Sequence, residues 1–130
     1  MPYRILFLDD DPTRIPGARA FYGKWLGEID LHTRYDVWGE DEVLPYDLIS
    51  LDNDLGVYGD VIRILRKRFF TDYQKMADTF RGKTIVVHSC NPVASGQLVT
   101  MMQKDFAITC FRIPFDKMLT EDYFPWAKPE

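Results

Sequence analysis

Two apolar segments of strand length, residues 3–8 and 47–52, dominate the pattern of this chain, because each stops abruptly in acidic residues. A near-continuous apolar run is typical of a parallel strand that is buried on both faces. Parallel strands end at one edge of their sheet, and open α/β folds place their ligand sites at that edge. The aspartates at the ends of the two runs are Asp9, Asp10, Asp11, Asp52 and Asp54. We therefore expect these carboxylates to converge.

The rest of the pattern alternates between strands and helices. Apolar residues at helical spacing, bounded by Pro, Asn and Gly, predict the helices, and β-rich runs predict the strands. The predicted strands are residues 3–8, 29–38, 47–52, 83–88 and 107–112. The predicted helices run from Pro12 to Gly27, from near Asp60 to Gly82 and from Asn91 to about Lys104, with one short helix after the break at Pro114.

This alternation predicts a single α/β domain over residues 1–130, built as a doubly wound sheet of five parallel strands. Right-handed crossovers favour the strand order 2-1-3-4-5, in which the chain reverses direction between strands one and three. Asp9, Asp10 and Asp52 would meet at that point, and His88 and Ser89 would end the neighbouring fourth strand.

Composition adds few constraints. A net charge of −4 gives no strong nonspecific affinity for nucleic acid or anionic membranes, so any such contact would be local, near Arg14, Arg63 to Arg68 or Arg112. The cysteines Cys90 and Cys110 are too few for a secreted disulfide scaffold. We find no leader and no apolar stretch of the ~20 residues that a membrane span needs. We expect a cytoplasmic protein with reduced thiols; the oligomeric state is not indicated.

The converging carboxylates favour a metal site. Crowded carboxylates repel one another unless a cation lies between them, and oxygen ligands suit Mg²⁺ or Mn²⁺. Asp9, Asp10 and Asp52 are the candidate ligands. The alternative is that these acids are solvated or serve as helix caps.

The segment His88 to Pro92 is the second candidate for chemistry. Asn is a good N-cap and Pro a good first helical residue, so Asn91 would begin a helix whose free N–H groups attract anions. His88 could transfer protons there. In the alternative, Asn91 only caps, Ser89 satisfies a turn and His88 is a half-buried polar residue. Arg14 would bind a phosphate or pair with the acids.

Together these segments resemble a receiver domain. The acidic pair at positions 9–10 resembles the metal-binding acids of receivers, Asp52 falls at their phosphorylated aspartate, and Ser89 falls near their hydroxyl. Residues 114–115 resemble the proline-aromatic step that follows the receiver lysine, but Ile113 stands in place of that lysine. Without this cation, we expect no stable phosphoryl group on Asp52.

The closer resemblance is to the cyclic-phosphate-processing receiver-like family. Its three motifs correspond to Ile5 to Asp10, Ser50 to Gly56 and His88 to Pro92, although Asn53 replaces a histidine of the family. The resemblance implies a metal-assisted phosphoesterase for cyclic or terminal phosphates of RNA or nucleotides. The implied metal ligands are Asp9, Asp10 and Asp52, the catalytic residues His88, Asp52 and Asp10, and the phosphate-binding residues Arg14, Ser89, Asn91 and Asn53.

Three other interpretations stay open. The same pocket could bind a phosphate or nucleotide without turnover, or Asp52 could accept phosphate in signalling. The segment Asp9 to Thr13 also matches the nucleophile loop of haloacid-dehalogenase-like phosphatases. Those enzymes need a lysine beside the phosphate and a late acidic motif, whereas Lys83 begins a strand and no late acidic pair is evident.

Overall fold

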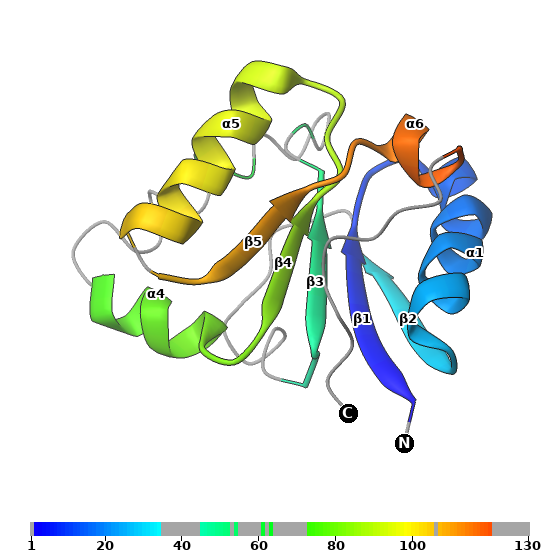
Figure 1. Cartoon of the computed structure of the whole chain (residues 1–130), viewed down its shortest axis with the longest axis horizontal. Coiled ribbons are helices and arrows are strands. Elements are labelled where there is room, and N and C mark those ends of the chain that lie inside the picture. Colours follow the sequence, from blue (N-terminus) through cyan, green and yellow to red (C-terminus); the bar gives the residue numbers. More distant parts are fainter. Residues whose placement is uncertain are drawn as a thin grey trace.

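In the computed structural model of the chain (Figure 1), residues 2–34, 45–52, 54, 61, 63, 73–105 and 107–120 are described. Within these residues, five parallel strands form one sheet in the order β2-β1-β3-β4-β5. The strands are β1 (Tyr3–Leu8), β2 (Ile29–Arg34), β3 (Leu48–Leu51), β4 (Thr84–Val87) and β5 (Thr109–Arg112). The strand order predicted from the sequence is confirmed.

The described helices lie near the predicted positions. They are α1 (Ile15–Leu26), α4 (Tyr73–Phe80), α5 (Pro92–Thr100) and α6 (Phe115–Met118), with a 3₁₀ turn at Pro12–Arg14 before α1 and a π-helical turn at Met101–Asp105 after α5. Gly27 ends α1 with φ 82°, a conformation that glycine adopts without strain. About half of the helix predicted from Asp60 to Gly82, and the end of the strand predicted at 29–38, lie outside the described residues.

The two faces of the sheet bury separate apolar clusters, because side chains along a buried strand alternate between its faces. Ile5 and Phe7 of β1 face α1 and α6, whereas Leu6 and Leu8 face α4 and α5. The alternation accounts for the apolar runs that dominate the sequence. None of the helices in the described part of the chain is both long and apolar enough to cross a membrane.

Strand register aligns the carboxyl ends of the three central strands. Leu8 of β1 pairs with Leu51 of β3, and Leu51 pairs with Val87 of β4. The residues that follow these three are Asp9, Asp52 and His88. Hydrogen bonds from the Asp52 N–H to the Leu8 carbonyl (2.9 Å) and from the His88 N–H to the Leu51 carbonyl (2.8 Å) extend the alignment by one step. The register thus sets three polar residues side by side, at the edge where α5 and α6 begin (Figure 1).

Candidate functional site

Asp9, Asp52 and His88 form a buried polar group at the carboxyl edge of the sheet. Each offers one ligand atom, and these atoms lie within 4.8 Å of one another. The side chains of Asp9 and His88 are 1% and 0% exposed, and that of Asp52 is 10% exposed. Asp10, which the sequence places with them, is exposed and lies outside this group. The structure therefore brings together two of the three predicted metal ligands.

The carboxylate of Asp9 accepts three hydrogen bonds. The Asp11 N–H donates to Oδ1 (2.8 Å), and Oδ2 accepts from His88 Nε2 (2.8 Å) and from Arg14 Nη1 (3.1 Å). Burial alone would raise the pKa of this carboxyl group, but the hydrogen bonds from His88 and Asp11 and the charge of Arg14 outweigh it and lower the pKa. Asp9 is therefore an ionised carboxylate, and both of its oxygens accept hydrogen bonds.

Arg14 lies between the two carboxylates. Its Nη1 is 3.1 Å from Asp9 Oδ2 and 3.4 Å from Asp52 Oδ2, and its guanidinium carbon is 5.1 Å from the centre of the Phe115 ring. Pairing with the acids is thus the arrangement that the structure shows. Ile113 is buried, as befits an apolar residue at the lysine position. Although Ile113 replaces the receiver lysine, Asp52 still has a cation beside it, because Arg14 reaches it from another element.

Asp52 differs from Asp9 in the balance of its surroundings. Burial raises the pKa of Asp52, and the negative charge of Asp9 adds to this effect. The charges of His88 and Arg14 and a hydrogen bond from the Ser89 side chain act in the opposite direction without cancelling the rise in pKa. Asp52 is therefore a poorly solvated carboxylate whose charge is only partly compensated.

His88 is more deeply buried than the sequence suggested. The sequence leaves two alternatives, a histidine that reaches a bound phosphate and a half-buried polar residue. In the structure His88 is completely buried, both ring nitrogens are engaged inside the protein, and the ring stacks on Phe7 at 4.4 Å. Asp9 can only accept, so Nε2 carries a proton. Nδ1 and Ser50 Oγ share a hydrogen bond of 2.8 Å, and Tyr22 donates to Ser50 (2.7 Å). Proton transfer by His88 stays a prediction.

Sequence reasoning missed Tyr22 and Ser50. Both are completely buried, and with His88 they form a chain of hydrogen bonds from α1 through the sheet to Asp9. A signal was available, because Ser50 is a polar residue inside the apolar run of β3. A buried hydroxyl needs a partner. The sequence alone does not say which one.

The predicted phosphate-binding residues at the start of α5 act as caps here. Asn91 Oδ1 accepts from the N–H groups of Val93 (3.0 Å) and Ala94 (3.2 Å), which are the donors that an anion would use. Ser89 Oγ accepts from the Asn91 N–H (3.2 Å). The structure thus contains the capping arrangement that the sequence left as an alternative. Asn53 lies outside the described residues.

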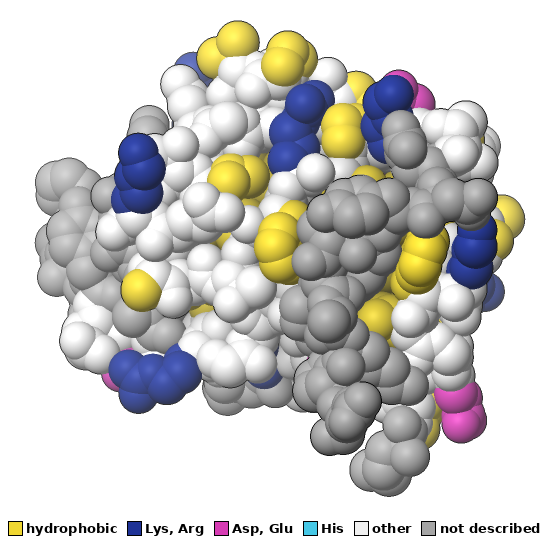
Figure 2. All heavy atoms as spheres, in the orientation of Figure 1, with side chains coloured by type: hydrophobic (Ala, Val, Ile, Leu, Met, Phe, Trp, Pro, Cys, Tyr) yellow, Lys and Arg dark blue, Asp and Glu magenta, His cyan; other side chains and the backbone are white. Residues whose placement is uncertain are grey.

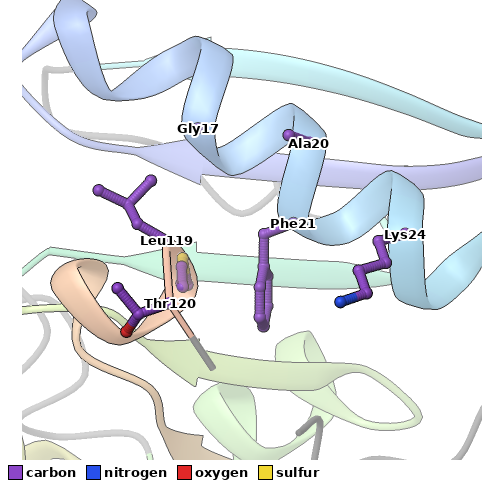
Figure 3. Close-up of a pocket in the computed structure, with 7 residues that line it drawn as sticks. Gly17, Ala20, Phe21, Lys24, Leu119 and Thr120 are labelled. Atoms are coloured by element: carbon purple, nitrogen blue, oxygen red, sulfur yellow. The ribbon is translucent and has the colours of Figure 1, made fainter. Parts of the chain in front are cut away.

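A separate pocket of about 250 Å³ lies between α1 and α6 (Figure 3). Its lining residues are Gly17, Ala20, Phe21, Lys24, Met118, Leu119 and Thr120. None of the predicted site residues contributes to it. Gly17 permits this close packing, because a Cβ there would lie 2.7 Å from Leu119 Cδ2 and 3.1 Å from Phe115 Cζ.

Basic side chains do not merge into one surface on the face shown in Figure 2. The dark blue Lys and Arg groups among the described residues stand apart from one another on that face. Arg14 is distinguished by its contact with the acids and not by membership of a basic patch.

Comparisons with known proteins identify the fold. No family model and no curated protein matches the chain. A solved structure of the phosphorylated cyanobacterial phytochrome response regulator RcpA is 16% identical, with a TM-score of 0.57 over 92% of this chain and 90% of that one. The signal receiver domain of a putative LuxO repressor protein from Vibrio parahaemolyticus is 14% identical, with a TM-score of 0.56 over 92% and 86%.

A sensor protein from Polaromonas sp. JS666 is also similar, at 20% identity and a TM-score of 0.53 over 90% of each chain. At these identities the likeness is one of fold. The chain has a receiver-type, flavodoxin-like fold, as the strand order already indicated.

Proposed function

We propose that the chain is a receiver-like phospho-signalling domain in which Asp52 accepts a phosphoryl group. The observation that carries this proposal is the position of Asp52 at the end of the central strand, with Arg14 3.4 Å from its carboxylate. Ligands of open α/β sheets bind at this edge. The likeness to receiver structures, one of which is of a phosphorylated regulator, supports the same assignment.

The chemistry required is the attack of a carboxylate on phosphorus. An oxygen of Asp52 forms a bond to the phosphorus of a small acyl phosphate, and the bond from phosphorus to the acyl oxygen breaks. The carboxylate of the donor leaves with the electron pair. Because burial disfavours the charged form of Asp52, its carboxylate is a less solvated nucleophile than one in water. Arg14 lies where it can stabilise the added negative charge.

The acidic group also fits a divalent ion. Asp9 and Asp52 direct oxygens to one place, and the positively charged group found between them is the guanidinium of Arg14. Carboxylate oxygens are the ligands that Mg²⁺ or Mn²⁺ takes in proteins. Such an ion, held by Asp9 and Asp52, would supply charge neutralisation for a phosphoryl group.

Treatment with acetyl phosphate and MgCl₂ tests the proposal. Intact mass spectrometry is expected to find a phosphoryl adduct on the wild-type protein and none on Asp52→Asn. Asp54→Asn is the matched control, because Asp54 is an exposed acid two positions away and is expected to leave the adduct in place. An unmodified wild-type protein, or equal labelling of Asp52→Asn, would contradict the proposal.

A second candidate is the phosphoesterase that the family resemblance implies, with a phosphate-bearing nucleotide or RNA end as its partner. In its favour, Asp9, Asp52 and His88 from three separate motifs meet at one place. Against it, both ring nitrogens of His88 are engaged within the protein. We expect no turnover of 2′,3′-cyclic nucleotides with Mg²⁺. If turnover occurs and falls by roughly two to four orders of magnitude in His88→Ala, this second function takes precedence.

A further inference from the structure

Arg14 occupies the place between the two carboxylates that a metal ion would need. Its Nη1 contacts Oδ2 of Asp9 and Oδ2 of Asp52 at 3.1 and 3.4 Å, so one positive group bridges both acids. The same two carboxylates are the donors assigned above to a divalent ion. Arg14 and the ion therefore cannot both take these contacts.

Of the donors to Asp9, Arg14 has the most freedom to leave. The Asp11 N–H belongs to the backbone two residues along, and His88 is completely buried and held at both ring nitrogens. Arg14 has a side chain that is 26% exposed and attached through a flexible stem. Entry of a metal at Asp9 thus requires this one donor to withdraw.

In the same conformation, Arg14 makes two further contacts besides those to Asp9 and Asp52. Its Nε lies 3.8 Å from Oδ2 of Asp11, whose side chain is 45% exposed, and its guanidinium lies 5.1 Å from the centre of the Phe115 ring. A guanidinium over an aromatic face is attracted by the ring. These two contacts do not involve Asp9 or Asp52.

We propose that Arg14 is a tethered cation that fills the metal position between Asp9 and Asp52 and must withdraw from both carboxylates before a divalent ion enters. Metal binding and the position of Arg14 are then linked, and each weakens the other by the same factor. The inference rests on the proposed function only in assigning the metal to these two carboxylates; it does not depend on phosphorylation of Asp52.

Calorimetric titration with Mn²⁺ tests the tethered cation. Arg14→Met removes the charge and keeps the apolar stem, so the fraction of sites open to metal rises and the dissociation constant is expected to fall by about tenfold or more. Arg19→Gln is the matched control, because Arg19 is an exposed arginine on α1, the helix that follows Arg14, and its guanidinium donates to the Leu31 carbonyl. Its affinity for Mn²⁺ is expected to equal that of the wild type.

A second variant tests the shape of the cation at an unchanged charge. Arg14→Lys keeps the charge but loses the planar fork, and an affinity between those of wild type and Arg14→Met is expected. Circular dichroism verifies the fold of each variant. Should Arg14→Met fail to fold, Arg14→Lys decides the question, and an Mn²⁺ affinity of Arg14→Lys no higher than that of the wild type would overturn the proposal.

Equal Mn²⁺ affinity in wild type and Arg14→Met would overturn the tethered cation, and so would a lack of binding in both. The acetyl phosphate experiment separates this failure from that of the proposed function. An Asp52 adduct with no effect of Arg14→Met on Mn²⁺ binding rejects the tethered cation alone. Tighter Mn²⁺ binding in Arg14→Met without any adduct on wild type rejects the phospho-signalling function alone.

Discussion

Asp9 and Asp52 are neighbours at the end of adjacent strands, yet their surroundings act on them in opposite directions. Hydrogen bonds and Arg14 lower the pKa of Asp9 against the effect of burial, whereas burial and the charge of Asp9 raise the pKa of Asp52. Two interacting acids whose environments separate their pKa values are typical of functional sites. The opposite pKa shifts of Asp9 and Asp52 predict opposite effects of their asparagine variants on the free energy of unfolding.

Asp52→Asn is expected to raise the free energy of unfolding at pH 7 in EDTA. The folded protein holds the proton of Asp52 to a higher pH than the unfolded chain does, so the contribution of this residue to stability falls as the pH rises above the ordinary value of 3.8. The asparagine side chain in Asp52→Asn carries no charge, so the variant does not lose this contribution to the free energy of unfolding as the pH rises. Urea unfolding of wild type and variant at neutral and acidic pH measures the difference, which should shrink toward low pH.

Asp9→Asn supplies the contrasting case, with an expected loss of about 2 kcal/mol at pH 7, because charge-assisted hydrogen bonds are weakened. The pKa of Asp9 is lowered, so its stabilising effect is present above the ordinary value of 3.8 and disappears as the pH falls through the folded pKa. If both asparagine variants are less stable than the wild type at pH 7, the charge of Asp52 does not destabilise the folded protein, and the prediction is contradicted.

The chain from Tyr22 through Ser50 to His88 predicts an unequal pair of effects. Ser50→Ala takes away the hydroxyl that contacts both neighbours, and a loss of about 1–3 kcal/mol is expected in this buried site. Tyr22→Phe removes the hydroxyl that donates to Ser50 and leaves the contact between Ser50 and His88 in place, so its loss is about 1 kcal/mol. Urea unfolding of both variants checks the order; a larger effect of Tyr22→Phe would contradict it.

At the level of elements, the sequence predicted the sheet well and the side chains less well. The apolar runs located β1, β3 and β4 to within one or two residues, because strands buried on both faces leave a continuous apolar signal. The meeting of Asp9 with Asp52 followed from strand order alone. The burial of His88 and its contact with Ser50 did not, because they depend on which face each side chain points to at the sheet edge.

Arg14 illustrates the same boundary between what the sequence holds and what it does not. Its sequence neighbourhood allowed either a phosphate contact or a pairing with the acids. The geometry of the turn at Pro12–Arg14 selects the pairing, since it directs the side chain over Asp9. From Ile113 at the lysine position the sequence predicts no stable phosphoryl group on Asp52. That prediction does not count Arg14, because a charge supplied by a different element leaves no sign at position 113.

Glycines in the helices and turns give a prediction at this scale. Gly96 lies in α5 with open space where a Cβ would be, so Gly96→Ala is expected to stabilise the protein by about 0.5–1 kcal/mol. Gly82, before β4, has φ +76°, and Gly82→Ala is expected to destabilise by roughly 1–2 kcal/mol. Thermal unfolding of the two variants tests both signs; a lower melting temperature for Gly96→Ala would contradict the open space.

For the molecule as a whole, the two cysteines report on the integrity of the sheet. Cys90 is exposed beside α5, whereas Cys110 is buried in β5, where burial raises its pKa to about 12. A buried thiol with a raised pKa is a poor nucleophile. Cys90 is expected to react with a disulfide reagent in the native protein, and Cys110 only as the chain unfolds.

Cys90→Ser is the control for this measurement. In that variant the rate of modification in rising urea follows the opening of the sheet around Cys110, and the native protein is expected to stay unmodified. Rapid reaction of Cys90→Ser without denaturant would mean that β5 opens readily and that the two apolar layers do not unfold as one unit.

The positive charge at the acidic edge belongs to the polypeptide, since Arg14 stands at the entry to α1. Its effective concentration is therefore fixed by the length of a short tether, in the millimolar range or above, and not by the composition of the solution. Dilution, dialysis and chelation remove a dissolved ion but leave this charge where it is. While the fold persists, the acids keep a counterion, and any ion that enters competes with a rival that cannot diffuse away.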